Sequence, residues 1–492
     1  MKFTLKNIGL IKNSEIKLDG LTVITGHNNS GKTTVGKALY ACIEGANNTQ
    51  ERFNAYKHNF ILDVFKHIDY MLDNIININI NDDIDNDIDD SSTEQIESDF
   101  IENLYELYNK IKRPYYNNED VDEFYRLIKL LPEKLHNIIS NNIINHNEVF
   151  VEQQYIIKKI TNKINIIANR LDNYSLDDFQ KIYINGTLNI EFSEQIQPVK
   201  NKNNDLESNI IITDTDVNII NLSIKNNKVV NDNSECLYPP FKQILLIDNP
   251  FVLDELQLSH SRTLIFRKPL FERDLDNIDE NYNYLVLTGN HNNKLIKILS
   301  SEFYDKDLFE KGMEEKQYIN IENLLNSTVS GFIVRKNRGR GFEFKSDEYS
   351  LNISNLATGT KLFAIMKMLI SKGILDNETM LILDEPESHL HPEWQNIFAE
   401  LLILLVKDVN CRILLTTHSP NFLLAIEAFM YKHSIVDKCN FYKTQFNNDN
   451  ETVDYVLTNN TNEIYGDFVK FLSQVKQIRN TYAHYKEDID NE

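Results

Sequence analysis

The sequence predicts an α/β fold in which a largely parallel sheet is built from two parts of the chain that a long insertion separates. Three observations support this fold class. Near the N-terminus, a buried strand leads through a glycine-containing loop into a helix. In the C-terminal half, apolar strands alternate with helices, which is the pattern of parallel sheets covered by helices. Between these parts, from about Glu51 to Tyr238, the sequence becomes rich in Asn, Ile and Asp.

Length and composition limit the class of protein. The chain has 492 residues, more than one ordinary domain, and its 41% apolar content is enough for a sizeable core. Its 73 acidic and 51 basic residues give a formal charge of -22, which disfavours a general role in coating nucleic acid. The N-terminus lacks an apolar leader, and no stretch reaches the ~18 apolar residues that span a bilayer. We therefore expect a cytoplasmic protein without a membrane partner.

The N-terminal part reads as strands followed by one helix. Two short strands are expected near Phe3–Ile11 and Ser14–Leu18, and a buried strand at Leu21–Thr25 precedes a helix from Lys32 onward. In the insertion, helical patterning occurs near residues 100–131 and 148–171, and strand-like alternation near 209–230. The acidic run at 82–99 is expected to form a solvated loop.

The C-terminal part carries the denser pattern. An apolar strand is expected at Gln243–Ile247 and a hairpin at Gly331–Lys345. The final core is predicted as a helix at Thr360–Lys372, a strand at Met380–Leu383, a helix through Trp394–Leu405 and a strand at Arg412–Thr416. The expected parts are an N-terminal lobe (1–50), an inserted helical and β region (51–238), a core (239–436) and a C-terminal extension (437–492).

A phosphate-binding loop is the strongest motif. Residues 26–33 match the G-x-x-x-x-G-K-[ST] pattern between an apolar strand and a helix, so backbone N–H groups and the helix dipole can bind phosphates. Lys32 is expected to reach the β- and γ-phosphates of ATP and to face solvent otherwise, and Thr33 to bind Mg²⁺. The candidate ATP-binding residues of the loop are Gly26, Asn28, Asn29, Ser30, Gly31, Lys32, Thr33 and Thr34.

Two further apolar strands end in polar residues. The strand at 380–383 ends in Asp384 and Glu385, and adjacent carboxylates there are costly to bury unless they meet a metal or a proton donor. Asp384 is expected to hold Mg²⁺ through water, and Glu385 to orient or deprotonate the attacking water. The strand at 412–416 leads to His418. Such a histidine is more often structural when taken alone, but its company here favours a catalytic role.

Together, these motifs resemble those of the SMC, RecF and OLD-type relatives of the ABC ATPases. The resemblance rests on the phosphate loop, on Asp384–Pro392 as Walker B and D-loop, and on Thr417–Pro420 as H-loop. It implies an ABC-type P-loop domain, split here by a mainly helical insertion with some β structure, in which His418 contacts the γ-phosphate. His389 and His391 would belong to a dimer-facing loop, and we do not interpret their spacing as a metal site.

The resemblance also implies a site shared between two chains. Residues 355–361 occupy the place of the ABC signature, directly before a helix, and in relatives this loop caps the γ-phosphate bound by the other protomer. Thr358 and Gly359 are therefore candidate ATP-binding residues of a homodimer. Ala357 stands where a serine hydroxyl normally points at phosphate, so Thr358 or backbone N–H groups must replace it, and hydrolysis is expected to be slow.

Within this group, the sequence resembles stand-alone ATPase subunits of bacterial anti-phage systems such as Septu and PARIS. That resemblance implies an ATPase dimer that regulates or scaffolds a separate effector, such as a nuclease. Two alternatives remain open. One is a DNA-repair ATPase that clamps DNA, for which the basic cluster at 335–340 offers a possible nucleic-acid contact. The other is a HEPN-like ribonuclease acting through Arg479 and His484, which match the short R-x4-H pattern.

Overall fold

The computed structural model describes most of the ATP-motif regions and only part of the insertion. The described residues are 1–57, 175–198, 206–230, 234–258, 289–301, 308–336, 341–447, 452–458, 461–466 and 473–480, with isolated positions between 126 and 165. The helices predicted near 100–131 and 148–171 lie largely outside them, as do the acidic run at 82–99, the hairpin tip at 337–340 and His484.

The chain forms two compact units, of which one comprises residues 1–47, 180–265 and 287–492, and the other 48–179 and 266–286. The first unit contains a 12-stranded sheet in the order β6-β5-β4-β1-β2-β15-β14-β3-β13-β12-β8, with β7 paired to β5. Its strands are β1 (Lys2–Ile8), β2 (Ile11–Lys17), β3 (Leu21–Thr25), β4 (Ser208–Asp214), β5 (Val217–Lys225), β6 (Lys228–Val229), β7 (Glu235–Cys236), β8 (Gln243–Ile247), β12 (Thr379–Asp384), β13 (Arg412–Thr417), β14 (Cys439–Phe446) and β15 (Val453–Leu457).

Helices and a small second sheet complete the described structure, which confirms the predicted α/β class. The small sheet has the order β11-β10-β9. The remaining elements are α1 (Lys32–Ala46), α6 (Leu176–Phe192), α7 (Val252–Leu258), α8 (His291–Ser300), α9 (Leu308–Thr328), β9 (Phe332–Arg335), β10 (Phe342–Lys345), β11 (Ser350–Asn352), η4 (Ile353–Asn355), α10 (Thr358–Ser371), η5 (Pro386–His389), α11 (Pro392–Asp408), α12 (Pro420–Lys432) and η6 (Val436–Lys438).

The prediction of a largely parallel sheet is correct for one half of it only. Strands β14, β3, β13, β12 and β8 are parallel neighbours. Strands β1, β2, β4 and β5 pair antiparallel, and so do β6 and β7 with β5. The cause is local, because two-residue connections such as Gly9–Leu10 can join only antiparallel neighbours. The parallel half therefore carries the strand ends that hold the sequence motifs.

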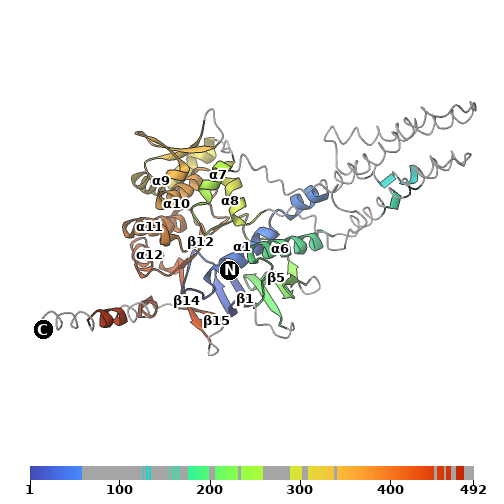
Figure 1. The fold of residues 1–492 in the computed structure, drawn as a ribbon, viewed down its shortest axis with the longest axis horizontal. Coiled ribbons are helices and arrows are strands. Elements are labelled where there is room, and N and C mark those ends of the chain that lie inside the picture. Colours follow the sequence, from blue (N-terminus) through green and yellow to red (C-terminus); the bar gives the residue numbers. More distant parts are fainter. Residues whose placement is uncertain are drawn as a thin grey trace, which may run out of the picture. The chain divides into compact units, whose positions relative to one another are not determined.

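Hydrophobic residues cover both faces of the parallel strands. Successive side chains of a strand point to opposite faces, so Leu381 and Leu383 of β12 join one buried cluster while Met380 and Ile382 join the other. The first cluster contains apolar residues of α10, α11 and α12, and the second contains those of α1. Figure 1 shows α11 and α12 side by side, with α1 next to β12. This packing fixes the C-terminal ends of β3, β12 and β13 at one edge.

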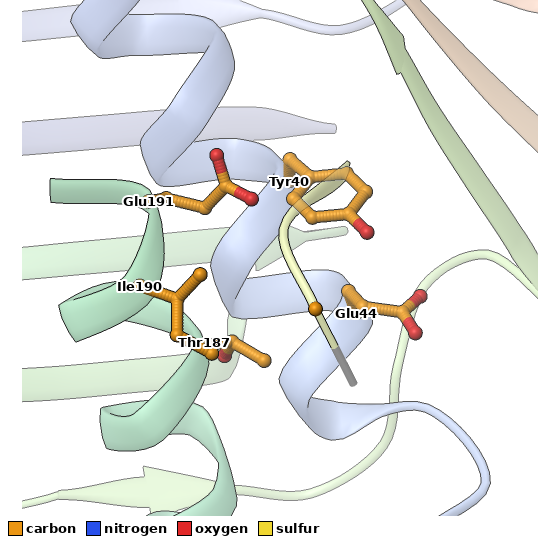
Figure 2. A pocket seen from close by; sticks show the side chains of 6 residues that line it. Tyr40, Glu44, Thr187, Ile190 and Glu191 are labelled. Carbon is orange, nitrogen blue, oxygen red and sulfur yellow. The ribbon is translucent and has the colours of Figure 1, made fainter. Parts of the chain in front are cut away.

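A buried group of charged side chains connects α1, α6, β8 and α8. The ring of His291, which is 5% exposed, has its Nδ1 2.7 Å from Glu191 Oε2 and its Nε2 3.0 Å from Asp248 Oδ2. Tyr40 packs edge-on against this ring. Figure 2 shows residues of α6 facing Tyr40 and Glu44 of α1, and the space between them does not admit a water molecule. These contacts therefore connect α6, α8 and the end of β8 next to α1, the helix that follows the phosphate loop.

We expect this charged group to make the stability of the fold decrease as the pH rises into the alkaline range. Burial alone would lower the pKa of His291, but its contacts with Asp248 and Glu191 raise that pKa from 6.5 to about 9. A pKa raised in the folded state stabilises the fold below pH ~6.5, and this contribution of about 3 kcal/mol is lost as pH rises through 9. In differential scanning fluorimetry, the melting temperature of wild type should fall over this window more steeply than that of His291→Gln. Parallel curves would contradict the prediction.

Candidate active site

The predicted phosphate loop connects β3 to α1. Asn29 and Gly31 have left-handed backbones, with φ of 62° and 77°. Gly31 makes no side-chain hydrogen bond to the start of α1, so the first N–H groups of this helix are available to an anion. A cavity of about 350 Å³ opens here, and its lining is Leu10, Asn28, Asn29, Ser30, Gly31, Lys32, Thr33, Thr34, Asp384 and Glu385. The structure thus gathers most of the predicted site residues around one cavity.

The first glycine of the loop is required by a close approach from β14. A Cβ atom on Gly26 would lie only 1.7 Å from Thr444 Oγ1 and 2.7 Å from Thr444 Cβ. No larger residue fits there unless β14 moves. Gly26 itself contributes a carbonyl oxygen to the site, which accepts a hydrogen bond from Nζ of Lys32.

Lys32 does not face solvent, contrary to the expectation from the sequence. Its side chain is 4% exposed, and its Nζ donates to the carbonyl oxygens of Gly26 (3.1 Å) and His27 (3.0 Å). Nζ also lies 3.4 Å from Glu385 Oε1. The reason is that an ammonium group inside the curled loop meets backbone carbonyls and a carboxylate at hydrogen-bond range. The loop therefore holds its lysine in place by itself.

The two predicted Mg²⁺ ligands, Thr33 and Asp384, are far apart in the sequence but form a hydrogen bond with each other. Thr33 Oγ1, at the start of α1, donates to Asp384 Oδ2 at the end of β12 over 2.6 Å. The other carboxylate oxygen of Asp384 accepts from the hydroxyl of Thr416. Hydroxyl and carboxylate oxygens beside a phosphate loop are the donor set that Mg²⁺ prefers, so these residues fit the ion.

Glu385 lies between Lys32 and His418 on a strained backbone. Its φ of 49° and ψ of 49° are left-handed, which costs a residue other than glycine roughly 1–2 kcal/mol. Its Oε1 faces Lys32, and its Oε2 lies 3.2 Å from Nδ1 of His418. Its backbone N–H donates to the carbonyl oxygen of Thr416 at 3.1 Å. The strain and the two contacts aim one carboxylate into the cavity at the end of β12.

Glu387 anchors the turn that contains His418, a role that was not inferred from the sequence. Its Oε1 accepts from the hydroxyl of Thr417 (2.5 Å) and from the backbone N–H of His418 (3.1 Å), and lies 3.7 Å from His418 Nδ1. Burial raises the pKa of this carboxyl, although these contacts oppose the shift. The only sequence signal for Glu387 was its position two residues after Glu385. It connects η5 to the turn after β13 and so fixes the place of His418.

The predicted signature residues are not among those that line the phosphate-loop cavity of the same chain. Thr358 and Gly359 open α10, and Ala357 before them gives the helix no side-chain cap. A Cβ on Gly359 would lie 3.2 Å from Trp394 Cε3 and 3.3 Å from the carbonyl oxygen of His389, so this helix end packs against the predicted D-loop. The N–H groups at this helix end therefore have no capping side chain.

Lys361 and the two histidines of the D-loop, His389 and His391, make contacts within the fold. Lys361, which is 2% exposed, lies 2.7 Å from Asp254 Oδ1 of α7. His389 packs edge-on against Phe251, and His391 caps the N-terminus of α11. The contacts of Lys361 and His389 connect the signature helix and the D-loop to the segment that follows β8.

The residues of the alternative predictions are only partly described. Arg479 is exposed in the helical stretch at 473–480, whereas His484 lies outside the described residues. Of the basic cluster, Arg335 and Lys336 are described. Across the described part of the chain, we find no helix with the length and apolar character needed to cross a membrane.

Comparisons with known proteins agree on the type of domain. A family profile described as "AAA ATPase domain" matches residues 1–423. The zinc import ATP-binding protein ZnuC of Buchnera aphidicola subsp. Schizaphis graminum is 28% identical over 120 residues, which cover 23% of this chain. The match covers 48% of ZnuC, so the chain spans about half the length of this curated relative.

Solved structures of SMC head domains are also similar to this chain. The SMC head domain from Thermotoga maritima is 9% identical with a TM-score of 0.32, covering 93% of this chain and 98% of that one. An SMC head bound to the C-terminal winged-helix domain of ScpA is 9% identical with a TM-score of 0.39, covering 93% and 97%. The matched family region includes β3, α10, β12 and β13, and it ends before β14 and β15.

Proposed function

Because this chain belongs to the AAA ATPase domain family and is an ATPase, we propose that Mg²⁺-ATP joins two copies of it and that this dimerisation regulates or scaffolds a separate effector protein. The observation that carries the proposal is the position of the signature residues. Thr358 and Gly359 lie away from the cavity of their own chain, at a helix end that no side chain caps.

We assign hydrolysis to residues that follow or form the C-terminal ends of β3, β12 and β13. Lys32 binds the β- and γ-phosphates. Its ammonium group then donates to phosphate oxygens in place of the backbone carbonyl oxygens that it contacts in the free chain, so it always has acceptors. Thr33 and Asp384 hold Mg²⁺, which when bound neutralises charge on the phosphates. Glu385 orients the attacking water and takes its proton. His418 contacts the γ-phosphate and holds Oε2 of Glu385 at 3.2 Å.

The second chain completes the site in this proposal. Helix N-termini bind anions through free N–H groups and the helix dipole, and α10 begins with such groups. Placed against the γ-phosphate of the opposite chain, they replace the hydroxyl that Ala357 lacks, together with the hydroxyl of Thr358. A dimer with two such sites is symmetric, so each chain gives its phosphate loop to one site and its signature to the other.

The effector part of the proposal rests on the resemblance to the ATPase subunits of Septu and PARIS. An ATP-dependent dimer has two states, and a partner that binds one of them better is controlled by nucleotide through linkage. A nuclease encoded beside this chain would be the expected kind of effector, acting in anti-phage defence.

Complementation between two inactive variants tests the shared site. We expect Lys32→Met to disable the phosphate loop, and Thr358→Glu to disable the signature by placing a carboxylate against the γ-phosphate. A glutamate in the first turn of α10 favours the helix itself, so the second variant should fold. Mixed in equal amounts, half the dimers should contain one chain of each kind. One of their two sites is then intact, and the mixture should recover about a quarter of wild-type turnover.

The result that would refute the shared site is a mixture no more active than the sum of its components. Full activity of Thr358→Glu alone would refute it as well. Mixing Lys32→Met with Glu385→Gln is the matched control, because both changes lie in the same half-site. Each of the two sites in their mixed dimers then carries one of the changes, so this mixture should show no recovery of turnover.

A further inference from the structure

Strands β14 and β15 follow the region that the family profile matches, yet they lie directly against the phosphate loop. Strand β14 is the parallel neighbour of β3 and pairs Lys443 with Thr25, the last residue before the loop. Strand β15 returns antiparallel to β14 and meets β2 at Ile11. The hairpin of these two strands therefore supports the loop from the side of the sheet.

Two side chains of the hairpin reach the loop. Thr444 of β14 packs so closely beneath Gly26 that no Cβ fits there. Tyr455 of β15 is 6% exposed, and its hydroxyl donates to the carbonyl oxygen of Ser30 over 2.9 Å. A Cβ on Gly31 would lie 3.4 Å from the same hydroxyl. Tyr455 thus holds the carbonyl oxygen of the Ser30–Gly31 peptide and lies close to Gly31.

The position of Tyr455 is itself fixed by the sheet. Its backbone N–H donates to Ser14 Oγ at 2.9 Å, and Oδ1 of the preceding Asp454 accepts from the backbone N–H of Asn13 at 3.0 Å. Burial and the nearby charge of Asp384 raise the pKa of the Tyr455 hydroxyl, so it stays protonated and remains a donor. The hydroxyl is therefore a fixed hydrogen-bond donor to the backbone of the phosphate loop.

The geometry of the peptide group gives this contact a consequence. In a planar trans peptide, the C=O of Ser30 and the N–H of Gly31 point in opposite directions. Holding the oxygen towards Tyr455 therefore directs the N–H of Gly31 away from the hairpin. Because residue 31 is a glycine with φ of 77°, a flip of this peptide would meet little steric resistance without an anchor.

We propose that Tyr455 is a positioning residue for nucleotide binding, whose hydroxyl locks the Ser30–Gly31 peptide in the orientation that offers N–H groups to the phosphates. The locked peptide is part of the free chain, so no ordering of it is needed when nucleotide binds. Once nucleotide is bound, the phosphates themselves hold the peptide. Loss of the hydroxyl should therefore weaken binding and leave turnover at saturation nearly unchanged.

The test compares two tyrosines of the same hairpin in the full-length chain. Tyr455→Phe keeps the ring and its packing but removes the anchor. Tyr442→Phe is the matched control, because its hydroxyl is also buried and accepts from a backbone N–H, that of Lys17, over 2.8 Å. We expect Tyr455→Phe to raise the dissociation constant for Mg-ADP about five- to tenfold in calorimetry. KM for ATP should rise similarly while kcat changes by less than about twofold.

Tyr442→Phe should lower the melting temperature without nucleotide about as much as Tyr455→Phe does, and leave the dissociation constant unchanged. An unchanged dissociation constant in Tyr455→Phe would overturn the proposal. An equal rise in Tyr442→Phe would also overturn it, because the effect would then be general loosening of the hairpin. Binding of Mg-ADP by one chain does not require dimerisation, so these outcomes are independent of the shared site.

Discussion

Replacing Lys32 by methionine is expected to weaken the binding of Mg-ATP by about a hundredfold or more. The ammonium group is the charge that the loop aims at the β- and γ-phosphates, and the thioether keeps only the aliphatic stem. In the structure, Nζ of Lys32 already lies between the carbonyl oxygens of Gly26 and His27. The variant loses these contacts too, so some stability should be lost together with affinity. Isothermal titration calorimetry with ATP and Mg²⁺ measures the first effect and thermal unfolding the second.

Lys367 offers a matched control for this change. Its Nζ also donates to two backbone carbonyls, of Val329 (3.2 Å) and Gly331 (3.0 Å), at the far end of α10. Lys367→Met should therefore lower the melting temperature by a similar amount and leave ATP affinity unaltered. Equal affinity of Lys32→Met and wild type would remove the basis for the phosphate-loop assignment.

Local motifs made much of the fold and the site predictable. A strand, a glycine loop and a helix are contiguous, so residues 21–46 could be placed from pattern alone. The pairing of Thr33 with Asp384 follows from one further rule, that the carboxyl ends of the parallel strands of one sheet lie at the same edge. The roles of Thr33, Asp384, Glu385 and His418 stay predictions, and the structure brings these residues together.

The features that were not predicted depend on distant pairing. Tyr455 and Ser30 are separated by 425 positions, and no local pattern marks a tyrosine in a short strand as a partner of a glycine loop. Strand β14 was not predicted either, because parallel neighbours far apart in the chain carry no turn signal between them. The buried position of Lys32 and the anchoring by Glu387 depend on side-chain directions that a sequence motif does not specify.

Glu385→Gln is expected to stop turnover while ATP still binds. The amide keeps the size of the carboxylate and can leave its oxygen towards Lys32 and offer its N–H to Nδ1 of His418. It cannot accept the proton of the attacking water, and loss of a general base slows such reactions by about a hundredfold to ten-thousandfold. Single-turnover assays should show bound ATP that persists, whereas wild type converts it to ADP.

Trapped nucleotide should also hold two chains together if the proposed shared site is correct, because a ligand bound by both chains stabilises their association through linkage. Light scattering with ATP and Mg²⁺ should then show a longer-lived dimer for Glu385→Gln than for wild type, and none for Lys32→Met. Glu378→Gln is the control, since it makes the same change just before β12, where the side chain pairs with Lys242. Hydrolysis by Glu385→Gln at the wild-type rate would show that another group activates the water. Equal assembly of Glu385→Gln and Lys32→Met with ATP would instead show that nucleotide does not join the chains.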